Sequence, residues 1–83
     1  MVHFTREAWE QYLYWQTTDR NILKRINQLI KDCTRDPFVG IGKPEPLKGD
    51  LAGFWSRRID DMHRLVYKYE NDELYVISCR FHY

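Results

Sequence analysis

The last third of the chain, residues 53–83, constrains the fold most, because it predicts three short strands joined by two tight turns. In the final run, the odd-numbered side chains suit a packed face, and the even-numbered ones grow polar towards the end. The first set is Tyr75, Ile77, Cys79 and Phe81, and the second is Leu74, Val76, Ser78, Arg80 and His82. This period of two predicts a strand with one buried face. On this pattern alone, Phe81 and Tyr83 hold the strand in the core while His82 faces water.

Another strand is predicted just before it, over residues 64–68. The two strands are separated by Glu-Asn-Asp at residues 70–72, and Asn and Asp favour turns because they tolerate left-handed backbone. The strands therefore form an antiparallel pair, whose polar face can carry Arg64, Arg80 and His82 together.

The first half of the chain predicts two helices after a short apolar strand at residues 1–4. Thr5 is a good N-cap for a helix over residues 6–15, and Thr17-Thr18-Asp19 marks a break and a new helix start. The second helix has an apolar stripe, made of Ile22, Ile26, Leu29, Ile30 and Cys33. The first helix carries more aromatic residues than one core-facing stripe needs. Either it packs between two surfaces, or part of its aromatic face meets a partner.

The other face of the second helix is basic. Its members include Lys24, Arg25, Lys31 and Arg35. Such a face is by default solvated, and contact with phosphate groups is the alternative interpretation.

One side chain in the strand predicted over residues 54–59 conflicts with its neighbours. A core-facing Ile59 places Arg57 on the same face. Either Arg57 pairs with an acid, or a bulge near Ser56 resets the register. The long connection before this strand, residues 36–50, is expected to pack and to contain a short extended piece near residues 45–48.

Length and charge limit the classes of protein that fit. Eighty-three residues allow one domain, spanning 1–83, and one core. The formal net charge of +1 gives no global basic field for nucleic acid. Cys33 and Cys79 lack metal-ligand or CxxC spacing, which favours buried thiols in a reducing compartment. With no signal peptide or membrane-spanning run, we expect a cytoplasmic protein without membrane association.

Four segments carry a resemblance to a known family: KPEPLK at 43–48, GFWSRRI at 53–59, HRLVY at 63–67 and CRFHY at 79–83. Together with Trp9, residues 12–16 and residues 31–32, they extend the resemblance over essentially the whole chain. The sequence is similar to the YoeB toxins of bacterial toxin–antitoxin systems, within the RelE/ParE superfamily. Phe81 stands where Tyr is expected, and Gly49-Asp50 replaces a bulkier pair.

The resemblance implies an α+β fold, in which two N-terminal helices pack on one face of a small antiparallel sheet. It also implies a metal-independent endoribonuclease without a cofactor, which cuts mRNA in the decoding site of the ribosome. Its partners would be the ribosome, mRNA and a cognate antitoxin with an acidic, partly disordered segment, and a homodimer is a further possible assembly.

The site residues follow from the same resemblance. Glu45 matches the family's general base, His82 its general acid, and Arg64 the group that stabilises charge on the phosphate. Tyr83 matches a tyrosine that positions the substrate. Lys48, Arg58 and Arg80 are the expected phosphate-binding residues of the same cationic face. Lys24, Arg25, Lys31 and Arg35 become candidate ribosome contacts.

Two other classes of function stay open. One is a non-catalytic inhibitor of DNA gyrase on the same superfamily fold, like the ParE toxins, and the other is a plain interaction module. Neither needs Glu45, Arg64 and His82 together, and this chain has all three. His3 and His63 lack such support, and His63 is interpreted as structural.

Overall fold

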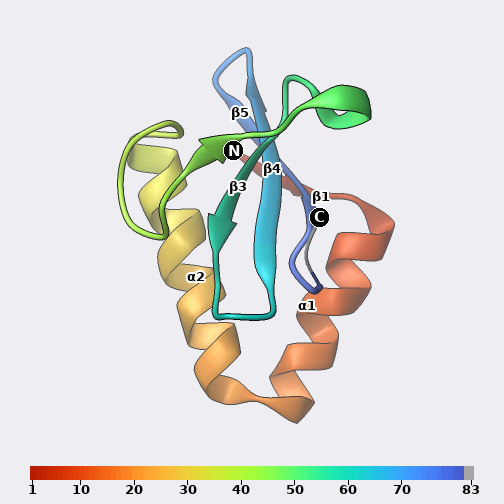
Figure 1. Cartoon of the computed structure of the whole chain (residues 1–83). Coiled ribbons are helices and arrows are strands. Elements are labelled where there is room, and N and C mark those ends of the chain that lie inside the picture. The colour runs from red at the N-terminus through yellow and green to blue at the C-terminus, as the bar shows by residue number, and fades with distance from the viewer. Residues whose placement is uncertain (82–83) are drawn as a thin grey trace.

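Two helices cover one face of a five-stranded sheet in the computed structural model, which describes residues 1–81 (Figure 1). The strands lie in the order β1-β5-β4-β3-β2. Their bounds are β1 Val2–Phe4, β2 Glu45–Pro46, β3 Trp55–Arg58, β4 Arg64–Glu70 and β5 Glu73–Ser78. Three neighbouring pairs are antiparallel, and β1 pairs with β5 in parallel at the edge. The α+β fold is thus confirmed, with one parallel pairing in the predicted antiparallel sheet.

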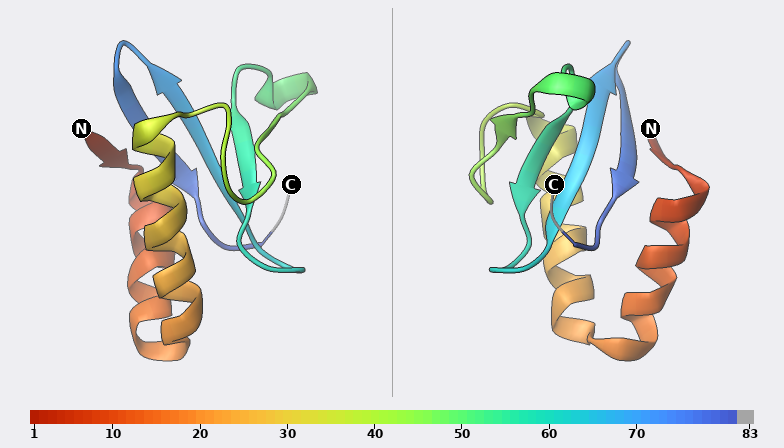
Figure 2. Two further views of the ribbon diagram at one scale, coloured as in Figure 1. Left: turned by 90° about the vertical axis from the view of Figure 1, so that its left-hand side faces the viewer. Right: turned by 45° about the vertical axis from the view of Figure 1, so that its right-hand side comes forward.

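The helices begin where the capping residues predict. Helix α1 spans Arg6–Thr18, three residues longer at its C-terminus than predicted, and the Thr5 hydroxyl caps it by accepting from the Ala8 N–H. Helix α2 spans Arg20–Arg35, and its N-cap is Asp19. Figure 2 shows both helices on one side of the sheet. A short 3-10 turn, η1, spans Gly49–Leu51. In residues 1–81, no helix has the length and apolarity to cross a membrane.

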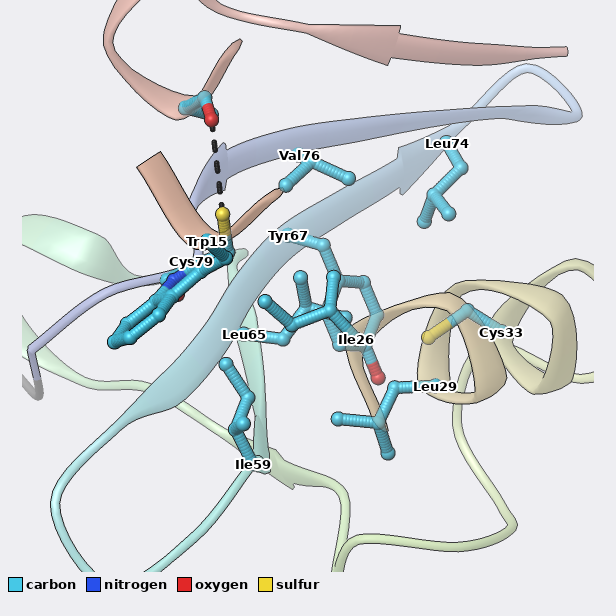
Figure 3. Packing of buried hydrophobic residues seen from close by; sticks show 11 residues of the cluster. Trp15, Ile26, Leu29, Cys33, Ile59, Leu65, Tyr67, Leu74, Val76 and Cys79 are labelled. Atoms are coloured by element: carbon cyan, nitrogen blue, oxygen red, sulfur yellow. Dashed lines mark hydrogen bonds between the residues drawn. The ribbon is translucent and has the colours of Figure 1, made fainter. Parts of the chain in front are cut away.

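The core lies between the helices and the sheet (Figure 3). Ile26 and Leu29 from α2 pack with Leu65 and Tyr67 from β4, and all four are fully buried. On the side of α1, the Cys79 thiol contacts the Ala8 carbonyl at 3.6 Å. Both cysteines are buried and free, as predicted, and burial raises the pKa of Cys33 to about 11 and that of Cys79 to about 12.

The prediction for the last strand was wrong in two respects. Leu74 and Val76, not the odd-numbered Tyr75 and Ile77, are the fully buried residues of β5 that join the core. Since both sets are apolar over residues 74–77, alternation could not tell the two faces apart. The strand also ends at Ser78. The residues after Ser78, which the sequence pattern assigned to the same strand, form a separate segment, in which Phe81 is exposed rather than packed.

The hairpin before β5 is tighter than predicted. Strand β4 continues to Glu70, so the turn contains only Asn71 and Asp72. Both have positive φ, 53° and 63°. Asn and Asp tolerate this left-handed backbone, which two-residue hairpin turns require.

Arg57 is fully buried and faces the helices, as the strand pattern predicted. Its guanidinium pairs with the Asp32 carboxylate at 2.6 Å. Strand β3 pairs with β4 without a bulge near Ser56, and the register irregularity of the sheet lies between Val66 and Tyr67 instead. Of the two interpretations left open by the sequence, pairing with an acid is therefore the one observed.

Candidate active site

The face of the sheet opposite the helices brings the central predicted residues together. Side chains alternate along a strand, so the inward position of Arg57 places Ser56 and Arg58 on the outer face. Cross-strand partners share a face, and the pairs Glu45–Ser56 and Arg58–Arg64 extend it over β2, β3 and β4. The resemblance predicted that Arg58 and Arg64 act on the same phosphate, and the strand register places the two residues opposite each other.

Glu45 and Arg64 are in contact on this face. The Arg64 Nη1 atom lies 3.5 Å from the Glu45 Oε1 atom. The Glu45 side chain is 60% exposed and that of Arg64 is 20% exposed. An exposed pair with this spacing contributes little to stability. It does hold a carboxylate that can accept a proton beside a cation that can bind a phosphate oxygen.

Arg58 and Arg64 face each other directly across two antiparallel strands. Like charges in this arrangement destabilise a sheet, and only Arg64 has an acidic partner among the described residues. The Ser56 hydroxyl beside them is buried and has no partner within residues 1–81. An anion bound over the two arginines would relieve their repulsion.

Lys48 follows β2 and is exposed. The Leu47 N–H donates to the Phe54 carbonyl, which ties the end of β2 to the start of β3. Lys48 then leads directly into η1.

Arg80 has a different environment. Its guanidinium lies 3.9 Å from the ring centroid of Tyr14 in α1 and 4.6 Å from that of Phe81, and its Nε atom is buried without a partner among the described residues. Such stacking stabilises a cation. Within the structure, Arg80 therefore contacts aromatic rings rather than Glu45 or Arg64.

His82 and Tyr83, the predicted acid and positioning residue, lie outside the described residues. The chain that leads to them is described. After β5, residues 79–81 cross towards the start of β4, where the Arg64 N–H donates to the Phe81 carbonyl at 2.9 Å. Two side chains hold this segment, Gln11 and His63. Sequence reasoning missed Gln11, whereas it interpreted His63 as structural.

The four candidate ribosome contacts differ in accessibility. Lys24 and Lys31 are exposed, whereas Arg25 is half-buried and donates to the Arg58 carbonyl at 3.4 Å. Arg35 pairs with Asp32 at 2.9 Å. An open groove of about 440 Å³ at this end of α2 is lined by Lys31 and Arg35, but by neither Glu45 nor Arg64.

The described residues offer no evident metal site. Within residues 1–81, no group of three or more His, Cys, Asp or Glu side chains is arranged to hold a metal ion. What the outer face does offer is acid–base and electrostatic chemistry on an anionic substrate.

Comparison with known proteins gives the family. Residues 4–83 match the family described as YoeB-like toxin of bacterial type II toxin-antitoxin system. The toxin YoeB of Streptomyces coelicolor is 60% identical over 82 residues, which is 99% of this chain and 98% of the relative.

Solved structures agree with this assignment. A YoeB/ParE toxin from Agrobacterium tumefaciens has a TM-score of 0.96 at 51% identity, over 99% of this chain and 98% of that chain. The YoeB-YefM complex from Staphylococcus aureus has a TM-score of 0.93 at 42% identity, over 100% of this chain and 97% of that chain. The chain belongs to the YoeB-like toxins of bacterial type II toxin–antitoxin systems.

Proposed function

We propose that this toxin is a metal-independent endoribonuclease that cleaves mRNA on the ribosome, in the cytoplasm. The observation that carries the proposal is the Glu45–Arg64 contact on a face where Arg58 is the cross-strand partner of Arg64. A base and two cations at this spacing suit a phosphodiester. The family assignment supports the same conclusion.

The reaction is an internal transesterification. Glu45 takes the proton of the 2′-hydroxyl, whose oxygen attacks the adjacent phosphorus, and the bond from phosphorus to the 5′-oxygen breaks. His82 gives a proton to that leaving oxygen. The products are a 2′,3′-cyclic phosphate and a 5′-hydroxyl. General acid and base groups each contribute roughly 100- to 10,000-fold to such a rate.

The cations act on the phosphate. Arg64 neutralises charge that develops on the phosphoryl oxygens, and Arg58 and Lys48 support it. Removing one preorganised charge contact costs roughly 100- to 1,000-fold in rate. Arg80 remains a candidate phosphate ligand, although its contacts with Tyr14 and Phe81 would have to be exchanged for that role. Tyr83 would position the substrate.

The test of the chemistry compares Glu45→Gln with Glu70→Gln on ribosome-bound mRNA. Glu45→Gln removes the base without changing its size and should lower cleavage by at least about 100-fold. Glu70 is also exposed and also pairs with a cation, Lys68, so Glu70→Gln is a matched control that should remain active. A message with 2′-deoxyribose at the cut position should resist cleavage.

We expect cleavage to depend on the ribosome, because the electrostatic attraction between this chain and free RNA is weak. Its net charge is +1, and phosphate contacts dominate affinity for a nucleic acid strand. In-line attack also needs an ordered backbone near the attack geometry. We propose that the decoding site orders the message while the basic face of α2 contacts ribosomal RNA.

Charge reversal separates this docking role from chemistry. Lys24→Glu with Lys31→Glu should weaken ribosome binding, yet spare slow cleavage of free RNA. Both residues are exposed, which makes them better targets than Arg25 and Arg35. Arg6→Glu on α1 is the control, because the Arg6 side chain is 94% exposed and lies on the other helix. Equal cleavage of free and ribosome-bound mRNA by the wild type would refute the dependence.

An antitoxin would cover this chemistry in the resting cell. The solved YoeB-YefM complex from Staphylococcus aureus supports a partner of that kind here. We propose that an acidic, partly disordered segment folds over Lys48, Arg58 and Arg64. Trp9 and Leu13 of α1 are exposed and offer apolar contacts. Binding that does not weaken with added salt would argue against the cationic face as the contact.

The alternative of a non-catalytic gyrase inhibitor is not supported by these comparisons. It remains distinguishable by experiment. Growth arrest that survives Glu45→Gln, without mRNA cleavage, would point to such an inhibitor.

A further inference from the structure

Residues 79–81, which join β5 to the last two residues of the chain, are held at several points. The Cys79 N–H donates to the Gln11 side-chain oxygen at 2.7 Å, and the Trp15 indole N–H donates to the Cys79 carbonyl at 3.0 Å. The Ser78 hydroxyl donates to the Arg80 carbonyl at 3.1 Å. This segment is therefore fixed by helix α1 before it reaches Phe81.

Phe81 itself is held by Arg64, the first residue of β4, and by His63, the residue before it. Its N–H donates to the Nδ1 atom of His63 at 2.8 Å, and its carbonyl accepts from the Arg64 N–H at 2.9 Å. The Phe81 side chain is not the anchor, because the residue is 56% exposed. Its φ of 67° is rare for a residue other than glycine, and surrounding contacts must hold it. The two backbone hydrogen bonds are the contacts that do so.

His63 is built to act as an acceptor. It is buried, and its ring lies 4.8 Å from that of Trp15 in an edge-to-face arrangement. The backbone N–H of His63 donates to the Asp60 carboxylate at 2.6 Å. An N–H that donates to Nδ1 requires this nitrogen to be unprotonated, so the ring hydrogen resides on Nε2. The ring is thus fixed in orientation and in tautomer.

We propose that His63 is a positioning residue, which sets the direction in which the chain leaves Phe81 and thereby aligns His82 and Tyr83 with the RNA. This inference rests on the proposed ribonuclease function. The bond to His63 holds the Phe81 N–H and so the adjacent Cα. Rotation about one bond, the ψ torsion of Phe81, is all that separates them from the peptide group that joins Phe81 to His82. The neighbouring Arg64 contacts both this segment and the proposed base, because its backbone N–H bonds the Phe81 carbonyl while its guanidinium contacts Glu45. One short stretch of β4 therefore connects the base, the cation and the path to the acid.

The test uses two substitutions that differ in where they place an acceptor. In His63→Asn, the amide oxygen can occupy the position of Nδ1, whereas in His63→Gln the amide lies near the position of Nε2. We expect His63→Gln to lower kcat on ribosome-bound mRNA by about 100-fold with KM unchanged, since a misplacement of about 1 Å costs that much. His63→Asn should recover most of this loss. His3→Gln is the control, because His3 bonds Glu73 at the far edge of the sheet and should leave kcat unchanged.

A measurement that does not depend on activity accompanies the kinetics. In ¹⁵N-labelled wild type, the Phe81 amide should show a scalar coupling to His63 Nδ1 across the hydrogen bond and slow exchange with solvent. That protection should be lost in His63→Gln and kept in His63→Asn. Absence of the coupling in the wild type would overturn the inference even if a variant failed to fold.

The outcomes separate the two proposals. If Glu45→Gln is inactive while His63→Gln cleaves as fast as the wild type, the positioning role is wrong and the ribonuclease stands. If the wild type does not cleave ribosome-bound mRNA, the proposed function fails, and the inference fails with it.

Discussion

Replacing Arg57 by leucine should destabilise the protein more than other single changes to its charged residues. The guanidinium donates to the Tyr67 hydroxyl at 3.2 Å, to Asp32 at 2.6 Å, and to the carbonyls of Ile41 and Asp36 at 3.1 and 2.6 Å. These contacts join β3 to α2 and to the connection before β2. The same contacts with Tyr67 and Asp32 raise the pKa of Arg57 against the opposing effect of burial.

The expected loss can be bounded. Removing one partner of a buried ion pair costs roughly 3–5 kcal/mol, and leaving a buried acceptor unpaired costs roughly 1–3 kcal/mol. Asp32 keeps a bond from the exposed Arg35 and one from the Ile41 N–H, so the low end applies. We expect Arg57→Leu to lose about 3 kcal/mol. A chain of this length has a total of roughly 4–12 kcal/mol, so much of the stability would disappear.

Urea unfolding at neutral pH measures this loss. With a slope of roughly 1–3 kcal/mol per molar urea, the midpoint should fall by at least about 1 M. Arg35→Leu is the matched control, because Arg35 bonds the same carboxylate from an exposed position and should shift the midpoint far less. Equal midpoints for Arg57→Leu and the wild type would refute the role assigned to this side chain.

Three further predictions follow from Asp32, the cysteines and Gly42. The hydrogen bond from Arg57 is the main reason that the pKa of Asp32 is lowered to about 2, below the roughly 3.9 of an unfolded aspartate. The contribution of the Asp32 carboxylate to stability is therefore complete above about pH 5 and is lost as the pH falls towards 2. In thermal unfolding, Asp32→Asn should weaken the decline of Tm over that range, and an unchanged decline would contradict the assignment. Because burial raises the pKa of Cys33 and Cys79, a thiol reagent at pH 8 should label the folded protein slowly and the unfolded chain fast; rapid labelling of the folded state would count against their burial. Gly42→Ala should lower the unfolding midpoint, since φ is 81° and a Cβ would lie 2.7 Å from a Leu29 methyl, and an unchanged midpoint would show that the connection adapts.

The sequence predicted most of the elements because local signals and tertiary structure agree there. Thr5 and Asp19 are caps in the structure as in the pattern, and the stripe that includes Ile26 and Leu29 lies on the sheet. The outer face of the site was also predictable in part, since Arg64 alternates with the inward-facing Leu65.

Other features depend on partners that are distant in the sequence. Arg57 pairs with Asp32, twenty-five residues earlier, and no local pattern selects that acid. Strand β5 is apolar on both faces, so its orientation is fixed by packing rather than by alternation. The role of His63 depends on Phe81, which is eighteen residues away and reached only after the chain has left the sheet.

The parallel pairing of β1 with β5 has a consequence for the order in which the molecule assembles during its own synthesis. Val2 is the partner of Leu74, and the Thr5 N–H donates to the Val76 carbonyl, so the first strand is completed by the last. Contacts between such distant residues form late, because a long loop must close before they stabilise anything. While the chain is being made, β1 and α1 emerge first and must wait for β5. A nascent chain therefore stays incompletely folded until its translation is nearly finished, because β1 gains its partner strand only at that stage.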